Sequence, residues 1–175
     1  MRTLISLRFR FCNNCHPVGS TATSSIARIS KRNALITWII VLVIALIAQQ
    51  GRACSLNVIG TNFGSYDMFS NVPLHSSGNI DINCPKGVGY NITLSVGNGT
   101  YEQRVMGSGA HALNYNLYTD ANRVLVWGDA TNGSAKVSSS GTGESVNHVV
   151  YGRIPAHQNV YPGSYSDTIT VVINF

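Results

Sequence analysis

The chain has 175 residues, a formal net charge of +5 and 11% charged residues. The charge is unevenly placed, because seven of the twelve basic residues precede Cys54 and all seven acidic residues follow it. The part from Cys54 onward therefore has five basic and seven acidic residues and a formal charge of −2. This balance gives no reason to expect a nucleic-acid or acidic partner.

The first recognisable segment is an export signal. Residues 34–48 are uncharged and almost wholly apolar, and Lys31 and Arg32 precede them. Gly51 and Ala53 follow as small residues at the −3 and −1 positions of a cleavage site. A basic region, an apolar region and a small-residue site in this order predict a secretory signal peptide.

We expect cleavage after Ala53, with cleavage after Ala48 as the alternative. The leader is then 1–53 and the exported domain is 54–175, which is the size of one domain. Two other interpretations stay open. The apolar segment is long enough to be a short uncleaved membrane anchor, and Cys54 is a weak match to a lipoprotein start.

Four cysteines divide between the leader and the exported domain. Cys12 and Cys15 form a single CxxC inside the leader, which is a weak signal, and we assign no structural role to residues 1–33. Cys54 and Cys84 are the pair left in the exported domain, which predicts a disulfide. By loop closure such a bond contributes about 3–4 kcal/mol.

After Cys54, short runs rich in Val, Ile, Thr and Tyr alternate between apolar and polar residues, as β-strands do. The runs are 55–59, 79–84, 90–96, 113–118, 124–127, 146–151 and 165–175. Clusters of Gly, Asn and Ser at 97–99, 132–133 and 138–143 predict turns or loops between them. We expect an all-β sandwich of roughly six to eight antiparallel strands.

The last run is the most apolar. Its apolar face holds Tyr165, Ile169, Val171, Ile173 and Phe175, and its polar face holds Thr168, Thr170 and Asn174. Such a strand needs a cover, because an exposed apolar edge invites aggregation. Either it lies in the middle of a sheet, or its pairing edge is left open for a strand from another molecule.

No chemistry-bearing cluster emerges from the sequence. The four histidines of the exported domain show no metal-ligand spacing: His75, His111, His148 and His157. No nucleophile-elbow pattern is present either, so we expect no enzyme activity and no cofactor. We expect Trp127 to be a core residue rather than a surface ligand platform, and Arg153 to cover apolar surface with its stem.

Two stretches resemble the motifs of the spore coat protein U domain family, which includes the Csu-type subunits of archaic chaperone–usher pili. The central stretch supplies Asn114, Tyr115, Asn116, Tyr118, Asp120, Trp127 and Gly128. The C-terminal stretch supplies Tyr151, Gly152, Arg153, Pro155, Gly163, Tyr165 and Asp167. The resemblance covers essentially all of 54–175, including the early cysteine pair.

The resemblance implies an incomplete immunoglobulin-like fold that lacks its last strand. A periplasmic chaperone lends a strand and holds the C-terminal carboxylate, here that of Phe175, and at the outer-membrane usher another subunit replaces that strand. The groove edge implied here is Thr168, Ile169, Thr170, Val171, Val172, Ile173, Asn174 and Phe175. The expected route runs through the inner membrane and the periplasm to a pilus on the cell surface.

One feature departs from fibre-forming members, which carry an alternating apolar extension before the first cysteine. Either cleavage site leaves at most 49–53 there, and none of these residues is strand-like. We therefore expect a subunit that accepts a donor strand without giving one, at a tip or as an accessory. The alternatives are a self-contained secreted adhesin, with loops 72–78 or 132–143 touching a surface, and a spore or cell-envelope coat protein.

Overall fold

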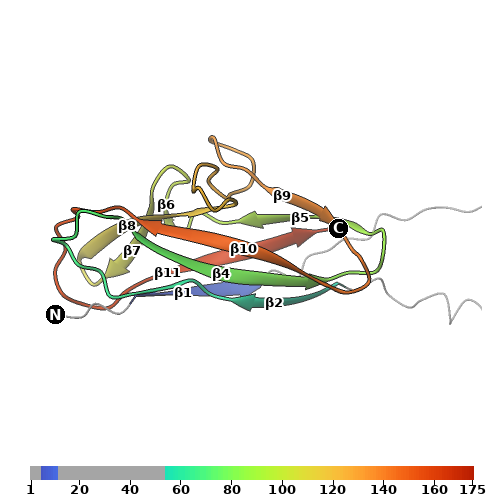
Figure 1. Cartoon of the computed structure of the whole chain (residues 1–175), viewed down its shortest axis with the longest axis horizontal. Helices are drawn as coiled ribbons and strands as arrows, with labels where there is room; N and C mark the ends of the chain where they lie inside the picture. The colour runs from blue at the N-terminus through green and yellow to red at the C-terminus, as the bar shows by residue number, and fades with distance from the viewer. Residues whose placement is uncertain (1–4, 12–53) are drawn as a thin grey trace, which may run out of the picture. The chain divides into compact units, whose positions relative to one another are not determined.

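Strands are the regular secondary structure of the residues described by this computed structural model, 5–11 and 54–175 (Figure 1). Within these ranges there are eleven strands and no helix, which confirms the all-β class. In chain order they are β1 (Ile5–Phe11), β2 (Ser55–Ile59), β3 (Asn62–Gly64), β4 (Leu74–Asn83), β5 (Gly89–Leu94), β6 (Asn98–Gly99), β7 (Arg104–Ser108), β8 (His111–Tyr118), β9 (Val137–Ser140), β10 (Ser145–Ile154) and β11 (Tyr165–Asn174).

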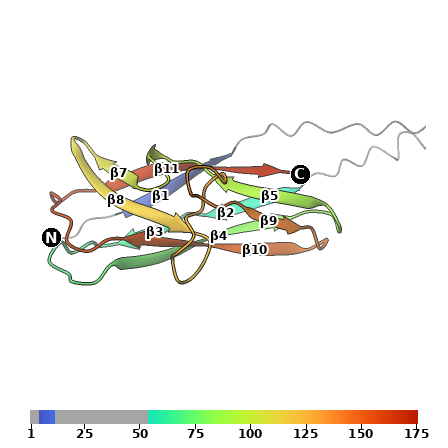
Figure 2. The ribbon, with the colours of Figure 1, turned by 90° about the horizontal axis from the view of Figure 1, so that it is seen from above.

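The strands of residues 54–175 form two packed layers (Figure 2). One layer pairs β2, β4 and β10, and the other pairs β11 with β5 and β7, while β9 extends β5 and β6 extends β7. β8 joins the layers, since its residues 111–115 pair with β7 and its residues 116–118 pair with β10. All of these pairings are antiparallel, as expected for a sandwich with one solvated face per sheet.

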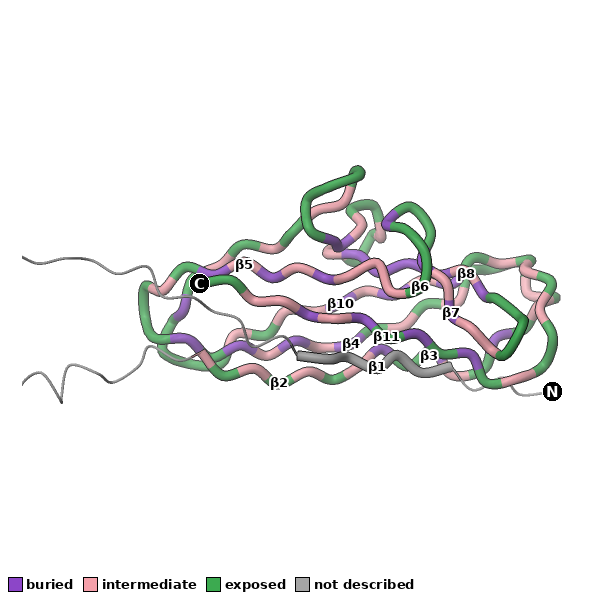
Figure 3. Tube along the Cα trace, turned by 180° about the vertical axis from the view of Figure 1, so that it is seen from behind, coloured by how far each residue is buried: buried purple, intermediate pink, exposed green. Residues whose placement is uncertain are grey.

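The core follows from the alternation within each strand. In β5, and in β11 from Tyr165 to Val171, every second residue is buried, and the alternate residues face solvent wholly or in part (Figure 3). Trp127 is 1% exposed, so the prediction that it is a core residue is confirmed. The largest fully buried side chains are Trp127, Arg104, Tyr90, Tyr115, Tyr165, Ile80, Ile82, Ile92, Leu94, Met106 and Leu113.

The predicted disulfide is present. Cys54 and Cys84 are bonded, with their Cα atoms 4.4 Å apart, and Cys84 is fully buried. The bond ties the residue before β2 to the residue after β4. Since β2 and β4 also pair along their length, the start of the domain is held against fraying by both the covalent bond and the ladder.

One predicted strand, 124–127, is wrong. Val124 and Leu125 are 73% and 55% exposed, and both of their amides donate to the carboxylate of Asp120, the Leu125 amide at 2.8 Å. An aspartate side chain that accepts hydrogen bonds from backbone amides a few residues later in the chain takes the donors that strand pairing would use. What remains of the expected strand is two isolated bridges, one between Val126 and Tyr118 and one between Trp127 and Ala135.

The loop expected at 138–143 is wrong in its first half, where β9 pairs with β5. Sequence patterns also missed β3, β6 and β7. The first two are only three and two residues long, and β7 contains a charged residue, Arg104, that turns out to be buried.

In the described part of the chain no helix is long and apolar enough to span a membrane. The predicted signal peptide at 34–48 lies outside the described residues.

Candidate strand-binding site

The last strand, β11, has neighbours on both of its edges. On one edge it pairs with β5 over Val171–Asn174 and with β7 at Ser166. On the other edge it pairs with β1, in parallel, over Tyr165–Val171. In the whole chain a strand from the N-terminal segment occupies this second edge (Figure 2). The expectation that the edge is open concerned residues 54–175 alone and stays a prediction.

The strand β1 also corrects the assumption that residues 1–33 carry no structural role. Ile5–Phe11 bridges β11 and β3, because Ile5 pairs with Gly64 and Ser6 pairs with Asn62 on its far side. The signal that could have identified it is the alternation Ile-Ser-Leu-Arg-Phe-Arg-Phe, which has a period of two like the strands of residues 54–175. The expectation that residues 1–33 belong to a leader gave no reason to look for a strand there.

A buried carboxylate fixes the middle of β11. Asp167 is 4% exposed, and its oxygens accept hydrogen bonds from the hydroxyl of Tyr115 (2.7 Å) and the amides of Asn98 (3.1 Å) and Thr168 (2.7 Å). Burial and the Asp167 carboxylate raise the pKa of Tyr115 well above its usual value, so its hydroxyl stays protonated and donates. Gly97 has φ +62° and packs directly against this carboxylate, where a Cβ would not fit.

A second buried network joins four segments through one guanidinium. Arg104 donates to the backbone oxygen of Ser95 (2.8 Å), the side-chain oxygen of Asn116 (2.7 Å) and the backbone oxygen of Trp127 (2.7 Å). Burial lowers the pKa of Arg104 from its usual value, because the charged form is removed from water. Asn116 then donates to the backbone oxygen of Tyr101 at 2.8 Å. Sequence reasoning named Asn116 and Trp127 but missed Arg104, since a lone arginine gives no sign of burial.

The C-terminal motif residues also have structural contacts. Arg153 donates to the hydroxyl of Tyr118 (2.7 Å) and stacks over its ring at 4.9 Å. Gly152 lies under the ring of Phe63, since an added Cβ would be 2.5 Å from its edge. Tyr165 donates its hydroxyl to the backbone oxygen of Tyr161 at 2.9 Å. These contacts fix corners of the sandwich.

The remaining motif residues shape turns. The backbone amide of Asn114 donates to the side-chain oxygen of Gln158 (2.8 Å), and the side-chain nitrogen of Gln158 donates to the backbone oxygen of Asn114 (2.9 Å). The hydroxyl of Tyr66 donates to the backbone oxygen of Pro155 (3.0 Å). Gly128 has no room for a Cβ beside Ser134 and Tyr101, whereas a Cβ at Gly163 would meet only the hydroxyl of Ser108 at close range. The fold therefore gathers the motif into three places: the Arg104 network, the Asp167 network and the turns around β10 and β11.

Along the edge that the resemblance implies, 168–175, the alternate side chains from Ile169 onward become more exposed to solvent toward Phe175. Ile169 and Val171 face the core at 0% and 2% exposure, Thr168 faces solvent, and Phe175 is 45% exposed just beyond β11. An edge of this kind binds through backbone hydrogen bonds and through pockets for alternate side chains.

The histidines do not come together. His111 stacks on Tyr161 at 4.4 Å, while His148 lies 2.9 Å from the Tyr90 hydroxyl. Burial lowers the pKa of His148. Among residues 5–11 and 54–175, no three His, Cys, Asp or Glu side chains are placed to hold a metal ion.

Comparison with known proteins gives one family. The Spore Coat Protein U domain profile matches residues 40–172. "Protein U" of Myxococcus xanthus is 33% identical over 148 residues, which is 73% of this chain and 80% of that protein.

Two solved structures are more distantly similar. One is a chain of the CsuC–CsuE chaperone–tip adhesion subunit pre-assembly complex from the archaic chaperone–usher Csu pili of Acinetobacter baumannii, at 21% identity and a TM-score of 0.48 over 70% of this chain and 40% of that chain. The other is the minor tip subunit of the E. coli Hda pilus, HdaB, at 14% identity and a TM-score of 0.36 over 68% of this chain and 79% of that chain. The match over 40–172 and the identity with Protein U show that this chain belongs to the Spore Coat Protein U domain family.

Proposed function

We propose that this protein is an exported structural subunit of a chaperone–usher type surface pilus, and that the edge of β11 accepts a strand from another molecule. The observation that carries the proposal is the parallel pairing at this edge, where β11 receives seven consecutive residues in register. Membership of the Spore Coat Protein U domain family supports it, since the resemblance to that family implies a subunit of this kind.

The edge suits a transient partner. The core-facing residues of β11 that lie along it include Tyr165, Ile169 and Val171, all at most 2% exposed with β1 in place. A domain that lacked the covering strand would leave one side of this row without a neighbour, and strand addition restores both the ladder and the apolar cover. Dependence on a donor strand is therefore the physical signature of this function.

The proposed partners follow from this signature. They are a periplasmic pilus chaperone, the outer-membrane usher and other pilus subunits, with export directed by the signal peptide at 34–48. We propose that the chaperone contacts this end of the edge, where Phe175 is 45% exposed just beyond β11. The subunit acts as a strand acceptor, at a tip or as an accessory, and no reaction is assigned to it.

The test uses residues 54–175 and a surrogate donor, a synthetic peptide with the sequence of residues 5–11. Alone, the domain should aggregate or unfold at a low temperature, and the peptide should raise its melting temperature in a concentration-dependent way. The matched control peptide replaces Leu7 and Phe9 with serine and should have no effect. A monomeric, thermally robust domain that ignores both peptides would contradict the proposal.

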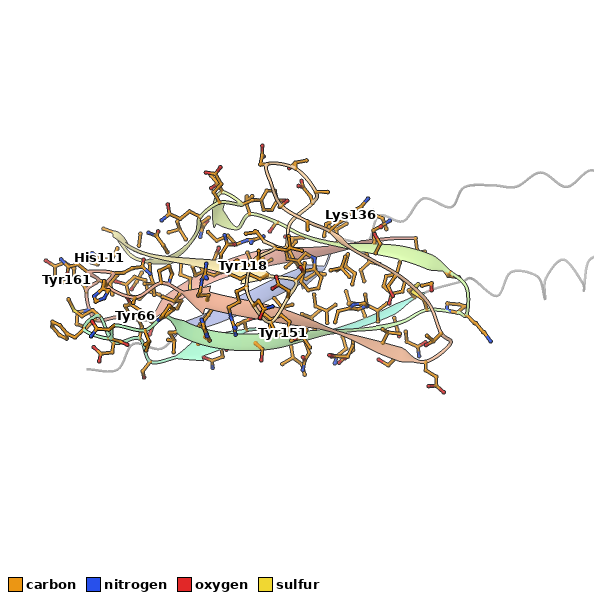
Figure 4. The ribbon with its side chains drawn as sticks, turned by 45° about the horizontal axis from the view of Figure 1, so that its top comes forward. Tyr66, His111, Tyr118, Lys136, Tyr151 and Tyr161 are labelled. Atoms are coloured by element: carbon orange, nitrogen blue, oxygen red, sulfur yellow. A yellow bond between two sulfur atoms is a disulfide. The ribbon has the colours of Figure 1, made fainter. Side chains whose placement is uncertain are left out.

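A second candidate function is adhesion, and an exposed apolar cluster favours it. Phe69, Val72 and Tyr161 are 81%, 69% and 67% exposed in two loops, 65–73 and 155–164. Tyr66 links these loops, because its hydroxyl donates to the Pro155 backbone oxygen and accepts from the Gln158 amide. Figure 4 shows Tyr66, His111 and Tyr161 at the same end of the domain. Large exposed apolar patches are typical of binding surfaces.

The adhesion test compares two variants that each remove two exposed apolar side chains. Replacing Phe69 and Val72 with serine should reduce retention of the donor-complemented protein on apolar beads. Replacing Val124 and Leu125, which are 73% and 55% exposed in a different loop, is the matched control and should not. Equal retention by both variants would contradict an adhesive role for this end.

A further inference from the structure

We infer that Ile5–Phe11 is an internal donor strand: before export, while residues 1–53 and 54–175 lie on the same side of the membrane, β1 closes the strand-binding site of its own chain. This inference rests on the proposed function, since it concerns the same edge of β11. It adds a role for the leader beyond export, because a signal peptide keeps its basic N-terminal region on the starting side of the membrane, so translocation separates β1 from β11 and opens the site.

The backbone pairing is extensive and specific. Seven residues of β1 pair in unbroken parallel register with β11, from Ile5 opposite Tyr165 to Phe11 opposite Val171. On its other edge β1 pairs with Asn62 and Gly64 of β3. The strand thus fills the space between two exported strands that do not pair with each other, which is the position of a missing strand.

The sequence of β1 matches this register. Residues in register on neighbouring strands share a face of the sheet. The four apolar residues, Ile5, Leu7, Phe9 and Phe11, are in register with Tyr165, Asp167, Ile169 and Val171, all of which are buried. The polar residues Ser6 and Arg8 are in register with the exposed Ser166 and Thr168. A slip by one residue would reverse every match, so the alternation specifies this register.

The one polar residue in the buried row does not disturb this match. Asp167 is in register with Leu7, but its carboxylate is already bonded to Tyr115, Asn98 and Thr168. It therefore requires no polar partner from β1. An apolar residue at this position of the donor strand leaves no buried group unsatisfied.

Occupancy by β1 has a regulatory consequence. A β-strand edge pairs with one strand at a time, so β1 and an external donor exclude each other over residues 165–171. Before export the chain is then closed to other strands, and it presents no bare apolar edge that would invite aggregation.

The test is a disulfide cross-link in the full-length chain, expressed without export in an oxidising cytoplasm and purified in mild detergent, with Cys12 and Cys15 replaced by serine. Arg8→Cys with Thr168→Cys joins register partners, which lie about 4.8 Å apart in neighbouring strands, within the disulfide range. Arg8→Cys with Asn174→Cys is the control, since its partner lies six residues, or about 20 Å, further along.

We expect an intramolecular cross-link in the first pair and none in the control. Absence of the first cross-link, or its formation only between two chains, would overturn the inference. A second measurement does not depend on cysteines. Hydrogen exchange of the β11 amides should speed up about tenfold or more in Leu7→Ser/Phe9→Ser and stay unchanged in Arg8→Ser/Arg10→Ser. Equal exchange in the two variants would also overturn it.

These results are separable from the test of the proposed function. A cross-linked full-length chain together with a robust, peptide-insensitive 54–175 domain would overturn the pilus proposal and leave the β1 pairing. A peptide-dependent domain without the cross-link would overturn the β1 inference and leave the pilus proposal.

Discussion

Replacement of Arg104 by methionine tests whether the buried guanidinium organises the domain. Arg104 is fully buried and makes four hydrogen bonds to three oxygens, two of them to the backbone oxygen of Ser95 at 2.8 and 3.1 Å. All the acceptors are neutral. Methionine has a similar length and fills much of the same space, so the change removes the donors with little loss of volume.

The magnitude follows from the acceptors left behind. Asn116 keeps a bond for its side-chain oxygen, because the Leu117 amide also donates to it at 2.9 Å. The backbone oxygens of Ser95 and Trp127 lose the donors that Arg104 supplied, and each buried acceptor without a partner costs about 1–3 kcal/mol. The saved desolvation of the guanidinium offsets part of this cost. We expect a net loss of about 2–5 kcal/mol, which is a large share of the stability of a small domain.

The assay is urea unfolding of residues 54–175 with the donor peptide bound, followed by the fluorescence of Trp127. Trp127 is the one tryptophan in that range and its carbonyl is an Arg104 acceptor. Arg104→Lys should lie between wild type and Arg104→Met, because lysine keeps the charge without the fork of donors. Arg153→Met is the control and should cost about 1–2 kcal/mol, since it loses one partly buried bond and one contact with the Tyr118 ring. An Arg104→Met loss no larger than this control would refute the reasoning.

Three further outcomes are expected in the same assay. Cys54→Ser with Cys84→Ser should lower the free energy of unfolding by about 3–4 kcal/mol under non-reducing conditions, and wild type in reductant should match it. Gly97→Ala should cost about 2–4 kcal/mol, because the backbone is left-handed there and a Cβ would overlap the carboxylate of Asp167. Because burial lowers the pKa of His148 in the folded state, the unfolded chain takes up its proton first; stability should fall as the pH drops below the usual value of 6.5, and His148→Gln should flatten that fall.

Much of the fold was predictable from local alternation. The predicted strands at 55–59 and 113–118 correspond to β2 and β8, and the run at 165–175 to β11. Alternation failed where local hydrogen bonds won, as at 124–127, where the Asp120 carboxylate binds the amides of an apolar run. The local pattern alone does not show that the apolar run at 165–175 finds a sheet partner and the apolar run at 124–127 does not.

The candidate site was predictable in part, for a different reason. The resemblance pointed to the β11 edge and to Asp167, but the roles of their neighbours depend on contacts between residues far apart in the chain. Arg104 reads as an exposed charge in sequence, and its burial results from the convergence of Ser95, Asn116 and Trp127 around it. Burial of a charge depends on such convergence, which no local pattern encodes.

On the proposed function, the two buried networks bear on how the sandwich keeps its shape while its edge strand changes. Asp167 bonds Tyr115 and Asn98, so it holds β11 to β8 and β6. Arg104 holds Ser95, Asn116 and Trp127 together, and the hydroxyl of Ser95 accepts a hydrogen bond from the Thr170 amide of β11. A core stabilised by apolar contacts alone would be free to slide when the covering strand leaves, whereas directional bonds to a fixed carboxylate retain the register of β11. The proposed strand exchange then requires new pairing without rebuilding of the core.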